Sequence, residues 1–233
     1  MPTAVILGSS GLVGRACLQA ILQSGAYGEI RAIVRRPLAL HHPALREVQT
    51  ELSRLEEHAE LFRTDAIFCC LGTTIKKAGS RPAFRLVDFD APVAAGRLAV
   101  RGEVRQFLIV TALGADSRSR VFYSRVKGEV EEELGRLGLP ELHIFRPSLL
   151  LGEREELRLG ESIAAPLMKA AGRLLPPRFA RYRPVEAAVV GRAMAAVALG
   201  LPGAPGVSSR AARRVYESDE IQEIGGRSKP VPD

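Results

Sequence analysis

Tyr123 and Lys127 form a pair of side chains that could transfer a proton. Their spacing of four residues places both on one face of a helix, about 5–6 Å apart at Cβ. A phenol has a pKa of about 10 in water, and a neighbouring ammonium lowers that value because it stabilises the phenolate. The pair is therefore a candidate acid or base near neutral pH. The alternative is an exposed helix pair without a function, because this spacing is common by chance.

A hydroxyl group twelve positions before the tyrosine extends this pattern. Thr111 ends an apolar run that is typical of a buried strand, and Ala112 follows it. At the end of a strand this hydroxyl could polarise a substrate carbonyl. If Thr111 and Tyr123 converge on one point, they would act on the same oxygen atom.

A glycine-rich turn connects a predicted strand to a predicted helix near the amino terminus. A glycine at the first position permits a tight turn, the second lets backbone N–H groups approach a diphosphate, and the third allows close packing of helix on strand. The helix amino terminus adds unpaired N–H donors and a positive dipole end. The pattern predicts a Rossmann-type dinucleotide site rather than a turn that is merely tight. Its residues are Gly8, Ser9, Ser10, Gly11, Leu12, Val13 and Gly14.

Two arginines indicate which dinucleotide is bound. Sites for NAD(H) usually place an acidic residue about 20 positions after the glycines, where it holds the ribose hydroxyls. This chain has Arg35 and Arg36 at that place. Guanidinium groups form charge-assisted hydrogen bonds with a 2′-phosphate, so the sequence favours NADP(H) over NAD(H).

The elements that must position these residues alternate along the chain. Short β-branched runs are followed by longer helical patterns, which is typical of an α/β protein with a doubly wound parallel sheet. The predicted strands are Ala4 to Gly8, Glu29 to Val34, Leu45 to Val48, Ala66 to Leu71, Gln106 to Thr111, His143 to Arg146 and Arg213 to Glu217. The predicted helices are Leu12 to Ser24, Leu52 to Leu61, Ala91 to Arg101, Phe122 to Leu137, Ser162 to Leu174 and Pro184 to Leu199.

Length and composition indicate one globular domain over residues 1–233. We expect residues 148–210 to form a small substrate lobe and residues 225–233 to form a frayed tail.

The net charge is +7, but arginines are spread along the chain among acidic residues, so we expect no nucleic-acid partner. Three cysteines and four histidines lack metal-ligand spacing, which predicts no metal site. No apolar run has the length of a membrane helix, and the first apolar stretch, Ala4 to Leu7, is too short for the hydrophobic core of a signal peptide. We therefore expect no membrane association and a cytoplasmic protein.

Three later segments carry a resemblance to a known family. They are the runs Val110 to Asp116, Phe122 to Glu131 and Phe145 to Leu151. Together with the glycine turn they resemble an atypical short-chain dehydrogenase/reductase of the Tat-interacting oxidoreductase subgroup and its bacterial relatives. The similarity extends from about residue 4 to 199. One departure is that the family generally has a serine where this chain has threonine at position 111.

The resemblance implies a Rossmann fold that binds NADPH. It implies that Tyr123 donates a proton, and that Lys127 tunes this group and holds the nicotinamide ribose. It also implies that residues after the fourth and sixth strands line the cofactor. These are Leu71, Gly72 and Thr73 on the adenosine side, and Pro147, Ser148 and Leu149 beside the nicotinamide.

These observations lead to an NADPH-dependent oxidoreductase that acts on a carbonyl or alcohol of a small-molecule substrate, with Tyr123, Lys127 and Thr111 as catalytic residues. A second hypothesis is a regulatory protein that binds NADPH without turnover and contacts other proteins, which the altered Thr111 favours. A third is an epimerase or dehydratase of a nucleotide sugar, for which the chain leaves little room. A homo-oligomer or a protein partner is compatible with each.

Overall fold

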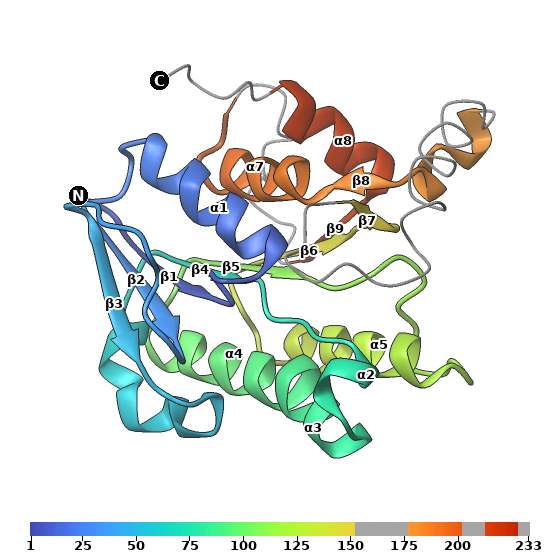
Figure 1. Ribbon diagram of the computed structural model, residues 1–233, viewed down its shortest axis with the longest axis horizontal. Coiled ribbons are helices and arrows are strands. Elements are labelled where there is room, and N and C mark those ends of the chain that lie inside the picture. The colour runs from blue at the N-terminus through green and yellow to red at the C-terminus, as the bar shows by residue number, and fades with distance from the viewer. Residues whose placement is uncertain (152–176, 202–212, 228–233) are drawn as a thin grey trace.

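The computed structural model describes residues 1–151, 177–201 and 213–227 of the chain. Its centre is a seven-stranded parallel sheet in the order β3-β2-β1-β4-β5-β6-β9 (Figure 1). The strands are β1 (Thr3–Leu7), β2 (Glu29–Val34), β3 (Leu45–Gln49), β4 (Ala66–Cys69), β5 (Gln106–Val110), β6 (Glu141–Arg146) and β9 (Arg213–Glu217). The predicted α/β fold with a Rossmann-type sheet is therefore confirmed.

The sheet order places a change of direction beside the glycine turn. β1 pairs in parallel with β2 on one side and with β4 on the other, so the chain runs outward from β1 in both directions. In open parallel sheets, ligands bind at the carboxyl ends of strands at such a switch point. The turn that follows β1 lies at this place.

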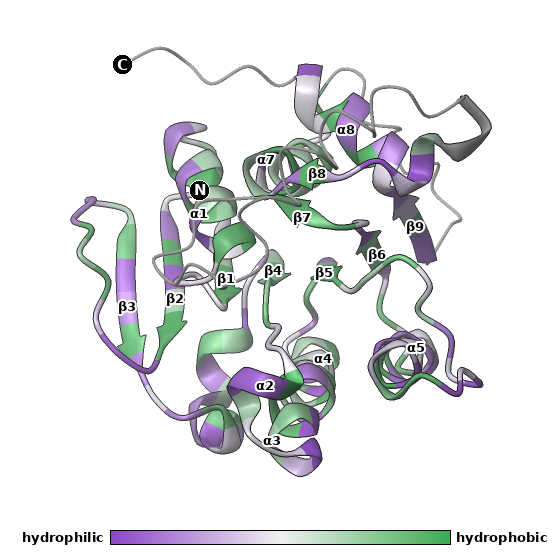
Figure 2. Ribbon diagram, turned by 45° about the vertical axis from the view of Figure 1, so that its right-hand side comes forward, coloured by the Kyte–Doolittle hydropathy of each residue, from purple (hydrophilic) through white to green (hydrophobic). Residues whose placement is uncertain are grey.

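Helices cover both faces of the sheet, which explains why its central strands are continuous apolar runs. Figure 1 shows α1, α7 and α8 above the sheet, and α4 and α5 below it. Figure 2 shows apolar residues on the central strands β1, β4 and β5, whereas the edge strand β9 is largely hydrophilic. Two buried clusters result, one on each face. The helices are α1 (Leu12–Gln23), α7 (Ala187–Ala198), α8 (Ser218–Arg227), α4 (Ala91–Arg101) and α5 (Phe122–Arg136).

Short helices that the sequence did not indicate connect β4 to α4. They are α2 (Ile75–Ala78), α3 (Arg81–Arg85) and the π-helical turn η2 (Leu86–Asp90). Thr74 caps α2 and Ser80 caps α3, each through a hydroxyl that accepts a backbone N–H. The segment therefore leads from the carboxyl end of β4 through these short helices directly into α4.

Two predicted helices differ from the structure. The helix expected from Leu52 is the 3-10 helix η1 (Leu52–Phe62), which is interrupted by non-helical angles at Arg54 and His58. The helix expected from Pro184 begins later, because β8 (Val185–Glu186) pairs with β7 (Leu150–Leu151) before α7 starts. Another 3-10 helix, η3 (Pro177–Tyr182), precedes β8.

The described residues include only part of the predicted substrate lobe and of the predicted carboxyl-terminal tail. The tail was expected from residue 225, but α8 continues to Arg227 and Gly225 is buried against Val189. The helix predicted from Ser162 to Leu174, and much of the predicted substrate lobe, lie outside the described residues. In the part of the chain that is described, no helix has the length and apolar character to cross a membrane.

Candidate functional site

The glycine turn after β1 has the close packing that only glycine allows. Gly8 has φ of +80°, and a Cβ there would lie 2.6 Å from the carbonyl oxygen of Cys70. A Cβ on Gly14 would lie 2.1 Å from the carbonyl oxygen of Gly8. The amide of Gly11 donates a hydrogen bond of 3.0 Å to that same oxygen. The turn is therefore folded tightly against the end of β4, and α1 starts immediately after it.

The donors of this turn fit an anionic ligand. The hydroxyl of Ser9 is buried and has no hydrogen-bond partner among the described residues. A buried polar group without a partner is costly, and a bound phosphate oxygen would satisfy it. Ser10 and Gly11 are exposed beside it, and the first turn of α1 contains no acidic residue. These features match the predicted diphosphate cradle.

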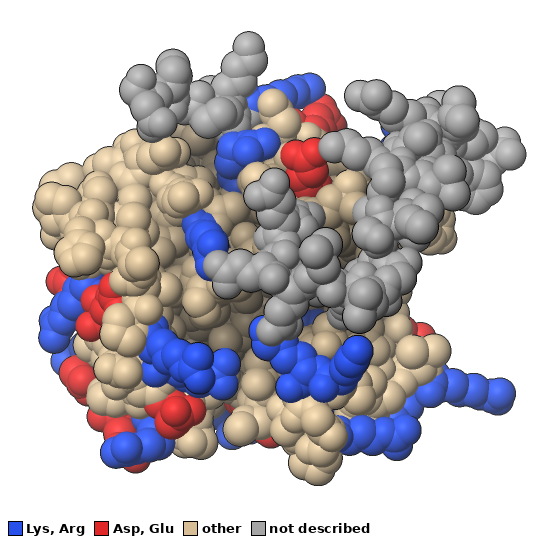
Figure 3. Space-filling view, in the orientation of Figure 1, with Lys and Arg blue, Asp and Glu red and all other residues tan. Residues whose placement is uncertain are grey.

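Positive charge surrounds this edge of the sheet. Arg35 and Arg36 follow β2 and are both exposed. Within the described chain, neither guanidinium has an ion-pair partner. Figure 3 shows Lys and Arg side chains gathered on this face over the carboxyl end of β2 and over α2, which carries Lys76 and Lys77. The surface near the turn is therefore suited to a ligand with several negative charges.

Tyr123 and Lys127 lie on α5 with very different exposure. Tyr123 is 36% exposed, and its ring packs against Phe84 of α3 with 5.9 Å between the ring centroids. Lys127 is buried, and its Nζ lies 2.8 Å from Oδ1 of Asp88. Burial by itself would lower the pKa of Lys127, but the charges of Asp88 and Tyr123 outweigh burial and raise it. The tyrosine thus faces solvent beside a buried, charged lysine.

The segment after β4 connects the lysine to the glycine turn. A Cβ on Gly72 would lie 3.8 Å from both Nζ of Lys127 and Oδ1 of Asp88. The amide of Thr73 donates a hydrogen bond of 2.9 Å to the other carboxylate oxygen of Asp88. Cys70, two residues before Gly72, contacts the glycine turn through its carbonyl. Residues 70–73 therefore touch the predicted diphosphate cradle at one end and the Lys127 ammonium at the other.

Asp88 is a site residue that sequence reasoning missed. Its pattern, Asp88 and Asp90 around Phe89 near a helix start, suggested helix capping. In the structure Asp90 is the residue before α4 and makes no side-chain cap, whereas Asp88 is buried in η2 and pairs with Lys127. The signal that could have found it is the placement of a carboxylate within an otherwise apolar segment that precedes a buried helix.

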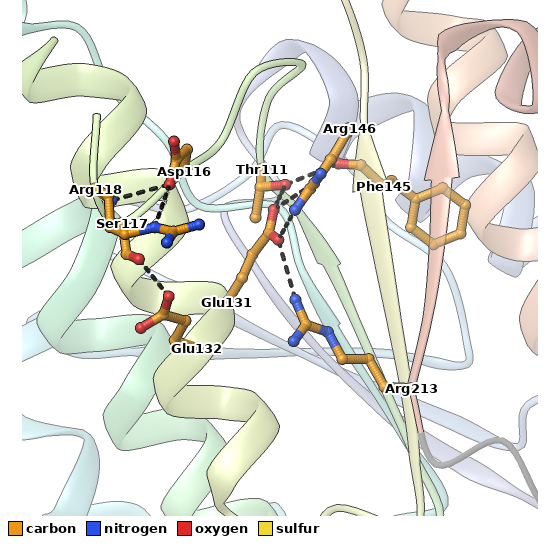
Figure 4. A network of polar contacts seen from close by, with 9 residues as sticks. All are labelled: Thr111, Asp116, Ser117, Arg118, Glu131, Glu132, Phe145, Arg146 and Arg213. Atoms are coloured by element: carbon orange, nitrogen blue, oxygen red, sulfur yellow. Dashed lines mark hydrogen bonds and ion pairs between the residues drawn. The ribbon is translucent and has the colours of Figure 1, made fainter. Parts of the chain in front are cut away.

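The structure does not bring Thr111 to the tyrosine and lysine. Its side chain is buried, and its hydroxyl donates a hydrogen bond of 2.7 Å to Oε1 of Glu131. Figure 4 shows this carboxylate between Thr111 and the guanidinium groups of Arg146 and Arg213, which come from β6 and β9. Glu131 lies eight residues after Tyr123, or about 12 Å farther along the helix axis. The Thr111 hydroxyl is therefore engaged in a separate buried network.

The residues after β6 form another wall at this edge. The carbonyl oxygen of Pro147 accepts a 2.9 Å hydrogen bond from the amide of Leu113, which ties the loops after β5 and β6 together. Ser148 donates its hydroxyl to the carbonyl of Arg183. Leu149 is 46% exposed, and its carbonyl accepts the amide of Val185. Of the residues predicted to border the nicotinamide, Pro147 is thus bonded to the loop after β5, and Leu149 is bonded to the segment that leads into α7.

Comparison with known proteins decides the family. No family model matches the sequence. The rat protein HTATIP2 is 37% identical over 193 residues, which cover 81% of this chain and 78% of the rat protein. The chain belongs to the HTATIP2 family. The mitochondrial protein FMP52 of Eremothecium gossypii is 30% identical and covers 95% of this chain and 96% of its own length.

Solved structures agree with this assignment at the level of fold. MoeE5 in complex with UDP-glucose and NAD matches 97% of this chain and 81% of its own, with a TM-score of 0.65 and 14% identity. At that identity the likeness concerns the fold alone. The relationship to HTATIP2 confirms the resemblance to the Tat-interacting subgroup that the sequence motifs indicated, and the fold agrees with that of an atypical short-chain dehydrogenase/reductase.

The prediction of a cytoplasmic protein is contradicted. Several fungal relatives, the FMP52 proteins, are named as mitochondrial proteins. The prediction rested on the short first apolar stretch, Ala4 to Leu7, and on the lack of an apolar run long enough for a membrane helix. Those features bear on membrane insertion and on secretion, and they do not discriminate between the cytoplasm and the interior of an organelle.

Proposed function

We propose that this HTATIP2-family member is an NADP(H)-dependent oxidoreductase that acts on a carbonyl or alcohol group. The observation that carries the proposal is the position of residues 70–73 between the glycine turn and Lys127. A dinucleotide whose diphosphate lies on the turn would extend along this segment toward Lys127 and Tyr123. The buried, unpartnered hydroxyl of Ser9 supports a phosphate at the near end.

The chain's own residues have distinct roles in this proposal. The turn from Gly8 to Gly14 holds the diphosphate, and residues 71–73 lie along the adenosine side. Bound NADPH would supply the hydride. Lys127 stabilises negative charge on the tyrosine oxygen and holds the ribose, while Tyr123 donates the proton to the substrate oxygen. Thr111 receives no role at the substrate, because its hydroxyl is bound to Glu131.

The preference for NADP(H) rests on the two arginines after β2. Arg35 and Arg36 are exposed, have no ion-pair partner in the described chain, and stand where a carboxylate would favour NAD(H). A 2′-phosphate would provide the anion that both can bind. Pro147 and Leu149 would border the nicotinamide from the loop after β6.

Turnover with a substrate panel tests the proposal. NADPH oxidation is followed at saturating cofactor against aldehydes and ketones of different size and polarity. Tyr123→Phe should lower kcat by a factor of about 100 or more and leave NADPH affinity unchanged. The matched control is Tyr27→Phe, since Tyr27 is a buried tyrosine that precedes β2 at the opposite end of the sheet. Equal rates for the two variants would remove Tyr123 from the mechanism.

One observation favours a second candidate function. The engagement of Thr111 with Glu131 leaves the tyrosine without the hydroxyl that the sequence predicted as a carbonyl polariser. A protein that binds NADPH and regulates a partner, without turnover, would tolerate this arrangement. It would show tight NADPH binding with no panel substrate turned over, and Tyr123→Phe would leave partner binding intact. The likeness to MoeE5 extends to the fold only and does not favour a nucleotide-sugar epimerase.

A further inference from the structure

The buried ion pair of Asp88 and Lys127 joins three separate elements at the centre of the site. Asp88 comes from η2, Lys127 from α5, and Gly72 with Thr73 from the segment after β4. One carboxylate oxygen lies 2.8 Å from Nζ of Lys127, and the other accepts the amide of Thr73 at 2.9 Å. The side chains of Asp88 and Lys127 are 0% and 5% exposed. The pair is therefore shielded from water and fixed on both sides.

The backbone around Asp88 has an unusual conformation. Asp88 lies within a π-helical turn, a rare conformation that occurs frequently at functional sites. The turn directly follows α3, whose Phe84 packs against the ring of Tyr123. One short segment therefore contacts the tyrosine through an aromatic side chain and the lysine through a carboxylate.

A lysine in this environment needs a compensating charge. Desolvation disfavours an ammonium, and fully buried lysines without a partner lose their proton at much lower pH than exposed ones. The titratable groups that face Lys127 are Asp88 from η2, Tyr123 from the preceding turn of α5, and Cys69 at the end of β4. Burial raises the pKa of Cys69 to about 12, so this thiol is neutral near pH 7. The carboxylate of Asp88 is then the anion that keeps the ammonium charged.

We propose that Asp88 is a positioning residue of the active site: it keeps Lys127 protonated before the cofactor binds and fixes this ammonium against the segment of residues 71–73. The inference deepens the proposed function and rests on it for the role of Lys127 in catalysis. The charge and the location of the Lys127 ammonium, however, can be measured in the protein without cofactor or substrate. Without Asp88, Lys127 would lose its proton at a much lower pH, and above that pH it would no longer stabilise a phenolate or hold a ribose.

Titration of the lysine side chains tests the proposal directly. The chain has five lysines, Lys76, Lys77, Lys127, Lys169 and Lys229. Protein with ¹³C-labelled lysine therefore gives few Cε signals, and Lys127→Arg assigns the signal of Lys127. In the native protein, the titration midpoint of the Lys127 signal should be equal to or higher than the midpoints of the other four lysines. A midpoint below theirs would overturn the proposal, and this measurement needs no variant at Asp88.

Asp88→Asn adds the second measurement, because an amide keeps the shape and removes the charge. The midpoint of Lys127 should fall by about three pH units, to below about pH 8, because the buried ammonium loses its counter-charge. NADPH affinity, measured by the fluorescence of the cofactor between pH 7 and 9, should fall at least tenfold with rising pH in this variant and stay nearly constant in the native protein. The matched control is Asp90→Asn, an exposed carboxylate two residues away. A purely structural role would lower thermal stability without moving either titration, and that result would overturn the proposal.

The two proposals fail in distinguishable ways. If no carbonyl substrate is found, the oxidoreductase assignment loses support, but the lysine titration still reports on Asp88. If Lys127 titrates at the same pH in Asp88→Asn and in the native protein, the positioning role is wrong even in an active enzyme. The Asp90→Asn control should match the native protein in both measurements.

Discussion

Thr111 and Glu131 are joined by a buried hydrogen bond of 2.7 Å that connects β5 to α5. The same carboxylate holds Arg146 of β6 at 3.0 Å and Arg213 of β9 at 3.3 Å. One acidic side chain thus links one helix to three adjacent strands, including the edge strand β9. This relationship explains why a residue that was predicted to bind substrate lies in the interior.

Thr111→Val should act on stability and leave cofactor binding unchanged. Valine keeps the branched shape and removes the hydroxyl, but Glu131 retains both arginines. We expect a loss of about 1 kcal/mol in the free energy of unfolding, measured with urea. NADPH affinity should equal that of the native protein. A large loss of turnover at unchanged stability would instead return Thr111 to the substrate site.

Removal of Glu131 should have a larger effect than removal of its neighbour on α5. Glu131→Ala leaves the partly buried guanidinium of Arg146 without its anion, and we expect a loss of about 3 kcal/mol. Glu132→Ala removes an exposed carboxylate from the next position and should change stability by less than about 0.5 kcal/mol. Urea denaturation of the two variants measures the difference, and equal losses would contradict a structural role for the Glu131 network.

Much of the fold could be predicted from the sequence because its signals are local. The run Glu29–Val34 has the same bounds in prediction and structure, since its apolar and β-branched residues identify a strand directly. The glycine turn could be placed for the same reason. The helices α2 and α3 have only four and five residues, which is too short for a periodic pattern.

The polar contacts of the site depend on residues that are distant in the chain. Asp88 pairs with Lys127, 39 positions away, and Glu131 pairs with Arg213, 82 positions away. No local pattern distinguishes a carboxylate that caps a helix from one that is buried against a lysine. The sequence located Tyr123 and Lys127 on one helix, but only the folded chain shows which of the nearby polar residues join them.

Gly14→Ala should disrupt the turn after β1. The new Cβ would lie 2.1 Å from the carbonyl oxygen of Gly8, a contact with backbone that cannot move without reshaping the turn. We expect loss of NADPH binding together with a lower melting temperature. Gly226→Ala is the control, because its Cβ meets no atom within 4 Å and alanine favours the helix α8. It should bind NADPH normally and gain about 0.5 kcal/mol. Normal binding by Gly14→Ala would argue against the turn as the diphosphate site.

Replacement of both arginines after β2 should change the cofactor preference. In the double variant Arg35→Ser and Arg36→Ser, NADPH affinity should fall at least tenfold, or about 1.4 kcal/mol, while NADH affinity stays the same. Fluorescence titration with each cofactor measures the ratio. Arg46→Ser, an exposed arginine on β3 that lies 3.7 Å from Glu29, serves as the control and should leave the ratio unchanged. An equal loss for both cofactors would contradict recognition of a 2′-phosphate.

His143 should make stability decrease at mildly acidic pH. Its Nδ1 lies 3.0 Å from the hydroxyl of Tyr216, its Nε2 is buried without a hydrogen bond among the described residues, and burial lowers its pKa. The imidazole of His143 therefore takes up a proton near pH 6.5 in the unfolded chain, but only at a lower pH in the folded protein. The contribution of the neutral imidazole is complete above pH 6.5 and is lost as the pH falls toward the lower pKa of the folded state. In urea denaturation at pH 7 and pH 5, the native protein should lose up to about 1 kcal/mol more than His143→Asn. Equal losses would show that this histidine accepts a proton in the folded protein as readily as in the unfolded chain.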